Sequence, residues 1–197
     1  MDQNGIRLIF RQFTRKKELF YTSYSLNSFF QIGDLYRLLI LIDKYYNYLL
    51  KDGFNKLCDW HNIEHFDFKN NNVYKLYISP RLYFTDDNEL RIGIISDAFC
   101  ITIIPNSNYF SFDLYTDLYT NINYRLDENN SYYKINQSQA AKKNREILSS
   151  FLFELEKVLD GYITEYSTTY YLTKESIFKY GLTENATLID DDYKDEL

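Results

Sequence analysis

The chain has 197 residues, of which 45% are hydrophobic, and its formal net charge is −6. This length and apolar content suit a globular domain with one core, and they exclude an intrinsically disordered chain. The acidic balance argues against a nucleic-acid-binding protein, because such proteins normally present a basic face to the phosphates. Only two prolines and six glycines occur, so no flexible linker is expected to divide the chain.

The first predicted element is a β-hairpin over residues 6–25. Its arms are rich in β-branched and aromatic residues, and the basic run 15–17 lies between them as a turn. A helix follows, with Asp34 suited to the N-cap and Gly53 to the C′ position. Apolar residues recur in it at the spacing that gives a helix one buried face. These residues are Leu35, Leu38, Leu39, Ile42, Tyr45, Tyr46 and Leu49.

A second, short helix is predicted over residues 54–62, and a polar loop follows at 69–72. Between them lie the two histidines of the chain, His61 and His65, with Glu64 in an H-x-x-E-H pattern. Two histidines four residues apart on one helical face form a workable zinc pair. The glutamate beside them suits a general base, so the pattern raises the possibility of a zinc hydrolase.

The segment HNIEHFDFK resembles the H-x-x-E-H start of the pitrilysin-type (insulysin-like) zinc metallopeptidases over about ten residues. The resemblance implies His61 and His65 as zinc ligands and Glu64 as the base. Those enzymes place the motif after a strand, at the start of a long helix, whereas here it follows a predicted helix and leads into a polar loop. The sequence offers no convincing segment for the third ligand. We therefore expect ordinary histidines, with no metal and no cofactor.

From residue 73 to residue 136 the sequence alternates short strand-like runs with turn signals. This pattern predicts an antiparallel meander. The runs 92–96 and 101–105 are the most continuously apolar, so we expect them at the centre of the sheet.

The clearest predicted helix begins with Ser138 as its N-cap and ends at Gly161. Residues 162–172 add a last strand to the prediction. Lys142 and Glu156 fall away from the apolar stripe of this helix and are expected to be exposed. The stripe consists of Ala141, Ile147, Leu148, Phe151, Leu152, Leu155, Val158 and Leu159.

Together these elements predict an α+β fold. We expect an antiparallel meander sheet of about five to seven strands, with a helix near each end of the chain packed on one face. A single domain is expected over residues 1–187, and a flexible acidic tail over residues 188–197.

Cysteine usage and hydropathy predict the cellular setting. Cys58 and Cys100 are too few for a disulfide scaffold and lie in apolar company, so buried thiols are expected. The N-terminal residues contain no signal-peptide h-region, and Asp43 and Lys44 interrupt the most apolar stretch. We expect a soluble, cytoplasmic protein without membrane contact. Since an entry signal is missing, the terminal KDEL is interpreted as the end of the acidic tail.

Aromatic residues are unusually frequent, with 21 tyrosines and 15 phenylalanines. An AT-rich genome explains such a composition, and so does a tyrosine-rich contact surface, because tyrosine is enriched at interfaces. The candidate binding tyrosines are Tyr109, Tyr115, Tyr119 and Tyr124, although the sequence does not say which of them face outward. The acidic turn of Asp86, Asp87 and Glu89 is a second candidate contact.

No nucleotide-binding loop, nucleophile elbow or CxxC motif occurs. The leading hypothesis is therefore a non-enzymatic protein-binding inhibitor: an immunity-type protein that occludes the active site of a cognate basic toxin. One alternative is an anti-defence protein of a phage or mobile element that blocks a host nuclease. Another is a hydrolase that uses the His61, Glu64 and His65 motif with a metal.

Overall fold

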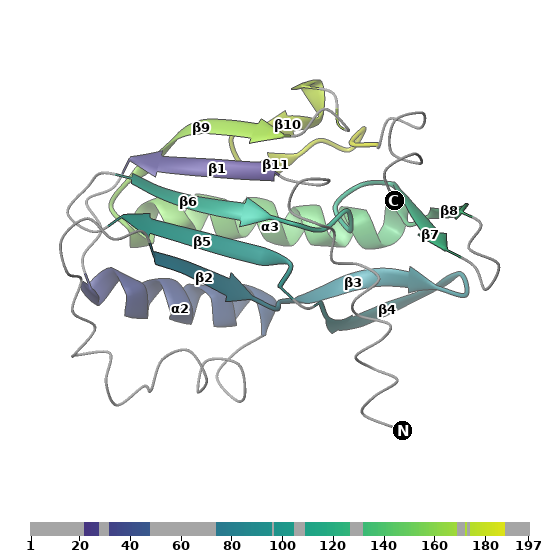
Figure 1. The fold of residues 1–197 in the computed structure, drawn as a ribbon, viewed down its shortest axis with the longest axis horizontal. Helices are drawn as coiled ribbons and strands as arrows, with labels where there is room; N and C mark the ends of the chain where they lie inside the picture. The colour runs from purple at the N-terminus through teal and green to yellow at the C-terminus, as the bar shows by residue number, and fades with distance from the viewer. Residues whose placement is uncertain are drawn as a thin grey trace.

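Five antiparallel strands form the central sheet, in the order β2-β5-β6-β1-β9 (Figure 1). The structure, a computed structural model, describes residues 22–27, 32–47, 74–95, 97–104, 109–126, 132–168, 172 and 174–187. The sheet strands are β1 (Thr22–Asn27), β2 (Tyr74–Ile78), β5 (Phe99–Ile104), β6 (Tyr109–Leu114) and β9 (Tyr162–Thr168). The helices are α2 (Ile32–Tyr46) and α3 (Ser138–Val158). The predicted α+β class with an antiparallel sheet is confirmed.

Long-range pairing fixes the order of the strands. β2 and β5 are neighbours, although the hairpin of β3 (Arg81–Asp86) and β4 (Glu89–Ile94) separates them in sequence. β1 lies between β6 and β9, so both of its edges are paired. Since a strand has only two edges, β1 is not an arm of the predicted N-terminal hairpin, and that prediction is wrong for this strand. The predicted last strand is confirmed as β9, at the edge of the sheet.

Aromatic contacts hold both helices on one face of the sheet. The ring centroid of Tyr46, on α2, lies 4.8 Å from that of Phe99, on β5. Phe151, on α3, lies 4.9 Å from Phe112 of β6 and 5.5 Å from Tyr46. All four side chains are fully buried, and edge-to-face geometry of this kind adds to the energy of burial. The predicted apolar stripe of each helix accounts for the orientation of its buried face.

Helix α2 ends earlier than predicted. Its last residue is Tyr46, and Asn47 follows with a left-handed backbone at φ 42°. Asparagine tolerates this conformation better than most residues and can replace glycine after a helix. The predicted C′ position at Gly53 is therefore wrong.

The ends of helix α3 also differ from the prediction by one residue each. Gln137, and not Ser138, holds the N-cap position, and it makes no side-chain cap hydrogen bond. Asp160 takes the left-handed conformation at φ 47°, and Gly161 N donates to Glu156 O at 2.9 Å. This is the Schellman pattern, with aspartate where the sequence suggested glycine.

In the described part of the chain, three two-stranded hairpins accompany the sheet. Asp87 and Asn88, both with positive φ, connect β3 to β4. The prediction that residues 92–96 lie at the sheet centre is wrong: they begin in β4, where Ile92 is 55% exposed. The run 101–105 lies mostly in β5, with Ile101 and Ile103 buried in the core. The other pairs are β7 (Ile122–Leu126) with β8 (Tyr132–Asn136), and β10 (Ile177–Phe178) with β11 (Gly181–Leu182), preceded by the short helix η3 (Lys174–Ser176).

Several predictions lie outside the described residues. They are the hairpin arm over residues 6–13, the helix over 54–62, the loop at 69–72, the acidic tail over 188–197, and the residues Cys58, His61, Glu64 and His65. Cys100 is described, and it is buried as expected.

Candidate binding groove on the polar face of the sheet

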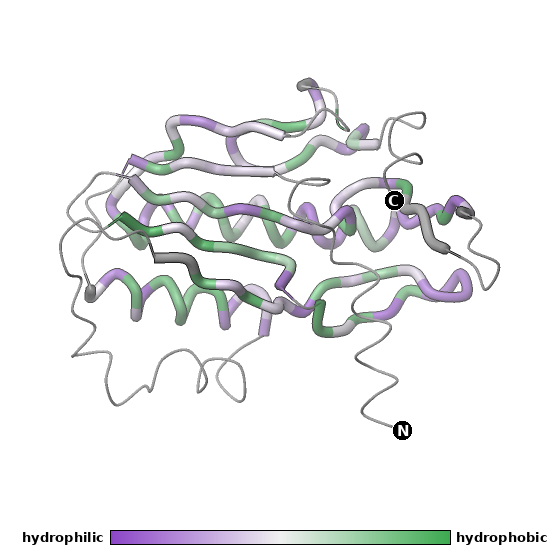
Figure 2. Tube along the Cα trace, viewed as in Figure 1, coloured by the Kyte–Doolittle hydropathy of each residue, from purple (hydrophilic) through white to green (hydrophobic). Residues whose placement is uncertain are grey.

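The face of the sheet opposite the helices is polar. Alternation along β1 turns Tyr24 and Leu26 toward the helices, so Ser23 and Ser25 point the other way. One row across this face contains Ser167, Ser23, Asp113 and Cys100, and the next contains Glu165, Ser25, Ser111 and Thr102. Figure 2 shows a difference between whole strands: β5 is mainly hydrophobic, whereas β1 and β9 are mainly hydrophilic or neutral.

Asp113 carries the buried carboxyl group of this face. Ser23 Oγ donates a hydrogen bond to Asp113 Oδ1 at 2.6 Å, and Ser111 Oγ donates to Asp113 Oδ2 at 3.3 Å. All three residues are buried. Burying a carboxyl group costs free energy unless its oxygens are hydrogen-bonded. These contacts satisfy the Asp113 oxygens, and the one from Ser23 links β1 to β6.

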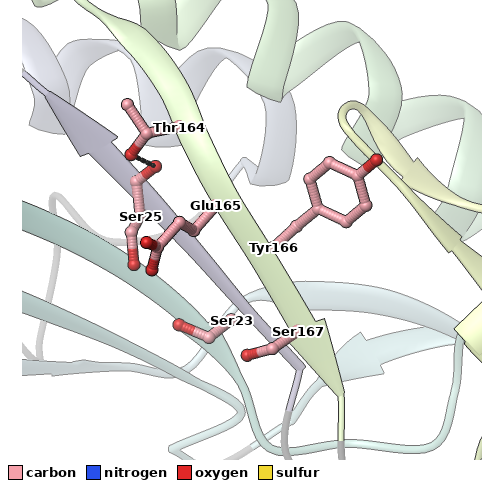
Figure 3. Close-up of a pocket in the computed structure, with 6 residues that line it drawn as sticks. All are labelled: Ser23, Ser25, Thr164, Glu165, Tyr166 and Ser167. Carbon is pink, nitrogen blue, oxygen red and sulfur yellow. Dashed lines mark hydrogen bonds between the residues drawn. The ribbon is translucent and has the colours of Figure 1, made fainter.

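A groove of about 450 Å³ lies over β1 and β9 on the polar side. Its lining is hydroxyl-rich and contains one carboxylate, that of Glu165 (Figure 3). Figure 3 shows Ser23, Ser25, Glu165 and Ser167 on the near side of the two strands. Tyr166 projects from the opposite side of β9. The groove therefore presents one negative charge among neutral oxygen donors and acceptors.

A β-bulge shapes the part of the groove lining around Ser25 and Thr164. The register between β1 and β9 shifts at Ser25 and Leu26, so that Thr164 is an extra residue in β9. Thr164 Oγ1 donates to Ser25 O at 3.3 Å. Bulges increase local twist and re-aim neighbouring side chains. Here the bulge keeps Glu165 beside Ser25 and Ile163 beside Leu26, one on each face of the sheet.

Several carboxylates of the described chain have an ion-pair partner there, and Glu165 has none. Asp34 is paired with Arg37, Glu154 with Lys44, and Glu156 with Lys179. Glu165 is exposed, and within the described part of the chain no lysine or arginine forms an ion pair with it. A cation from outside the chain can therefore approach this carboxylate without displacing a partner from the described part of the chain.

The edge strand β9 carries two exposed tyrosines: Tyr162 lies on the groove side, beside Asn27, and Tyr166 projects from the opposite side. Tyr162 is 55% exposed and Tyr166 is 45% exposed. Asn27 Nδ2 donates to Tyr162 Oη at 3.2 Å, which holds that ring beside the end of β1. Exposed tyrosines offer large contact area at low cost in side-chain entropy, which is why they are frequent in interfaces.

The tyrosines singled out from the sequence occupy different environments. Tyr109 is 42% exposed, at the start of β6. Tyr115 and Tyr119 are buried, so neither offers a contact surface in this structure. Burial, followed by the influence of the nearby Tyr46, raises the pKa of Tyr119 well above its ordinary value. Tyr124 lies in β7, at the far end of the molecule from the groove (Figure 1).

In the acidic turn predicted as a second contact, two of the three carboxylates pair with one arginine of the same hairpin. Arg91 Nη1 lies 3.0 Å from Asp86 Oδ2, and Arg91 Nη2 lies 3.3 Å from Glu89 Oε2. Asp87 is exposed at the tip. The structure does not bring this turn together with the groove, because the hairpin projects beyond the end of the sheet (Figure 1). Among the described residues, no group of three or more His, Cys, Asp or Glu side chains could hold a metal ion.

Sequence reasoning missed the groove residues. The alternation of polar and apolar residues in Thr22–Asn27 was available as a signal that β1 has one polar face. The pairing of β1 with β9 was not available, because it joins segments about 140 residues apart, and no local pattern specifies such a contact.

Comparison with known proteins adds no assignment: no family model, no curated protein and no solved structure matches this chain. Across the described residues, neither helix has the length and apolar character required to cross a membrane. The candidate site therefore rests on the groove, its carboxylate and the neighbouring Tyr162.

Proposed function

We propose that this protein is a non-enzymatic binding protein that captures a basic protein partner through the groove over β1 and β9. The finer form of the proposal is an immunity-type inhibitor, which occludes the active site of a cognate toxin. The observation that carries it is Glu165: an exposed carboxylate without an ion-pair partner in the described chain, inside a hydroxyl-lined groove.

The chemistry of the groove suits a lysine or arginine side chain. A guanidinium or ammonium group brings only donors, and Glu165 together with the serine hydroxyl oxygens supplies acceptors. The volume, about 450 Å³, lies at the lower end of the usual range for binding pockets, roughly 300–1,000 Å³. Tyr162 would then supply an apolar contact beside the charged pair.

The net charge of the chain supports the same partner. A protein of charge −6 attracts a basic partner and accelerates the encounter. At about 0.15 M salt the Debye length is about 8 Å, so this attraction acts mainly at close approach. We expect the association rate with the partner to fall as salt is raised, while the dissociation rate changes less.

The test is affinity capture from the native host, followed by binding kinetics with the captured protein. Glu165→Gln is compared with Glu146→Gln, which makes the same charge change on the exposed side of α3. We expect a basic partner whose affinity falls about tenfold with Glu165→Gln, equivalent to about 1.4 kcal/mol, and less than twofold with Glu146→Gln. An acidic partner, or equal losses for the two variants, would overturn the proposal.

The inhibitor form of the proposal has its own readout. If the captured partner is an enzyme, the wild-type protein should abolish its activity at equimolar concentration, and Glu165→Gln should require a higher concentration for the same inhibition. A captured enzyme that remains fully active in the saturated complex would rule out inhibition while leaving the binding groove in place.

A further inference from the structure

Among the residues that the structure describes, the hairpin of β3 and β4 has one protected edge and one open edge. Tyr83 N, on β3, donates to Asn144 Oδ1 at 2.9 Å, and Asn144 Nδ2 donates to Tyr83 O at 2.8 Å. The amide of Asn144 thus replaces a neighbouring strand for β3. β4 lies on the outer side of the hairpin, away from α3 (Figure 1), and in the described chain its only strand partner is β3.

The register of the hairpin shows which backbone groups of β4 point outward. Tyr83 is paired with Ile92. Because Tyr83 directs both of its backbone polar groups to Asn144, the pair is of the non-hydrogen-bonded kind, and Ile92 directs its own groups away from β3. The alternation of the ladder gives Leu90 and Ile94 the same outward direction.

The residues with outward backbone groups also carry the exposed apolar side chains of this strand. Ile92 is 55% exposed and Ile94 is 42% exposed, and Leu90 is half-buried. All three side chains lie on one face of the hairpin, because they belong to every second residue of β4. An open edge with an apolar stripe is a template for pairing with another strand.

We propose that β4 pairs antiparallel with β4 of a second copy of this chain, around a two-fold axis at Ile92. The two hairpins then form a four-stranded sheet. In this register Ile92 lies opposite Ile92 of the second copy, and Leu90 lies opposite Ile94. Each of these pairs exchanges two backbone hydrogen bonds, and the apolar stripes of the two copies join into one.

The sequence of β4 is self-complementary in this register, which suits a second copy of the chain as the occupant. A shift of the two-fold axis to Arg91 would place two arginines directly opposite each other, and like charges opposed in a sheet are destabilising. With the axis at Ile92, Arg91 faces Gly93, and no like charges oppose each other. A contact of one strand pair is smaller than a standard interface of about 1,600 Å², so we expect a weak dimer that forms as concentration rises.

Cysteine cross-linking tests the register. In a hydrogen-bonded antiparallel pair the Cα atoms lie about 5.5 Å apart, within disulfide reach. Ile92→Cys should therefore form a disulfide-linked dimer under mild oxidation, identified by peptide mass spectrometry at residue 92. Ile94→Cys is the matched control, because two Ile94 positions would lie about 13 Å apart along the strands. A mixture of Leu90→Cys and Ile94→Cys proteins should cross-link to each other.

Sedimentation velocity supplies the second measurement. The wild-type sedimentation coefficient should increase with concentration, and Ile92→Lys should remove this increase, because it places two ammonium groups on the axis. Since Ile92 is exposed, this variant should retain the wild-type circular dichroism spectrum. Equal cross-linking of Ile92→Cys and Ile94→Cys, or a wild-type protein that stays monomeric at every concentration, would overturn the proposal.

Discussion

The two faces of the central sheet are built from the same strands but have opposite chemistry. On the helix side, Phe99, Phe112 and Phe151 form a closed aromatic cluster with Tyr46. On the other side, serines and carboxyl groups form rows, and the groove with Glu165 opens over β1 and β9. The apolar face supplies the stability of the fold. On the polar face Ser23, Ser111 and Asp113 are buried, and our proposal assigns recognition to the groove over β1 and β9.

This division follows from the period of a β-strand. Successive residues point to opposite faces, so one short segment such as Thr22–Asn27 contributes Tyr24 to the core and Ser23 to the polar face. A substitution on the helix side should therefore affect stability, and a substitution of the exposed groove residue Glu165 should affect binding. The predictions below test this separation, beginning with the largest expected effect.

Phe151→Ala should be the most destabilising of these changes. The side chain is fully buried between both helices and the sheet, and its removal leaves a cavity among aromatic rings. We expect a loss of about 3–5 kcal/mol in the free energy of unfolding, measured by chemical denaturation. Phe153→Ala, two residues along α3 and 48% exposed, should cost less than about 1 kcal/mol. Similar midpoints for the two variants would contradict the assignment of the core face.

Asn144→Ala should come next, although asparagine is a polar residue on a helix. Its side chain is fully buried and bonds to Tyr83 N, Tyr83 O and Leu118 O. The alanine variant leaves these backbone groups without their partner, at a cost of about 2–4 kcal/mol. Lys142→Ala, on the exposed side of the same helix, should stay within about 0.5 kcal/mol. A stability loss confined to Lys142→Ala would show that the orientation of α3 is wrong.

Glu156→Gln should have a smaller effect that depends on pH. Burial by itself would raise the pKa of Glu156, but hydrogen bonds from Lys179, Tyr180 and the Ile163 backbone outweigh it and lower the pKa below its ordinary value of 4.5. A carboxylate with a lowered pKa stabilises the fold above its unfolded-state pKa, and this contribution is lost as the pH falls through the folded-state pKa.

Unfolding of the wild type and of Glu156→Gln should therefore be compared from pH 7 down to pH 3. We expect the variant to lose about 1–2 kcal/mol at neutral pH, because hydrogen bonds to a charged acceptor are weakened. The difference should shrink as the pH falls below about 4.5. A difference that grows toward acid pH would contradict the direction of the pKa shift.

Glu156 also illustrates what the sequence could and could not predict. The apolar stripe of α3 follows from local periodicity, so Phe151, Leu152 and their neighbours are identified correctly. Glu156 falls off this stripe and was expected to be exposed, yet it receives contacts from residues more than 20 positions away. Periodicity describes only which side of an element is apolar, and it carries no information on polar contacts made between elements.

The same limit explains the groove and the hairpin. The existence of β1, β5 and β9 is visible in local composition, whereas the neighbours of each strand are set by long-range pairing. Ile92 and Ile94 were predicted to lie in a buried strand because they belong to an apolar run. An apolar run has the same local sequence pattern whether the fold buries it or leaves it exposed. Their exposure on β4 is a tertiary property, as is the burial of Tyr115 and Tyr119.

Glu165→Gln should have the smallest effect on stability. The side chain is exposed and has no ion-pair partner among the described residues, so we expect a change within about 0.5 kcal/mol. Ser23→Ala, a change in the same groove lining, should lower the free energy of unfolding by more than Glu165→Gln does. It removes a hydrogen bond of 2.6 Å to the buried Asp113. A large loss of stability with Glu165→Gln would mean that the groove is part of the core scaffold and would end the separation between the two faces.

Hydrogen–deuterium exchange of the complex with the captured partner tests the central claim most directly. If the polar face recognises the partner, exchange should slow in peptides that cover residues 22–27 and 162–168. Peptides from α2 and the exposed side of α3 should exchange at the rate of the free protein. Protection of the helices, with unchanged exchange over β1 and β9, would contradict the assignment of recognition to the groove.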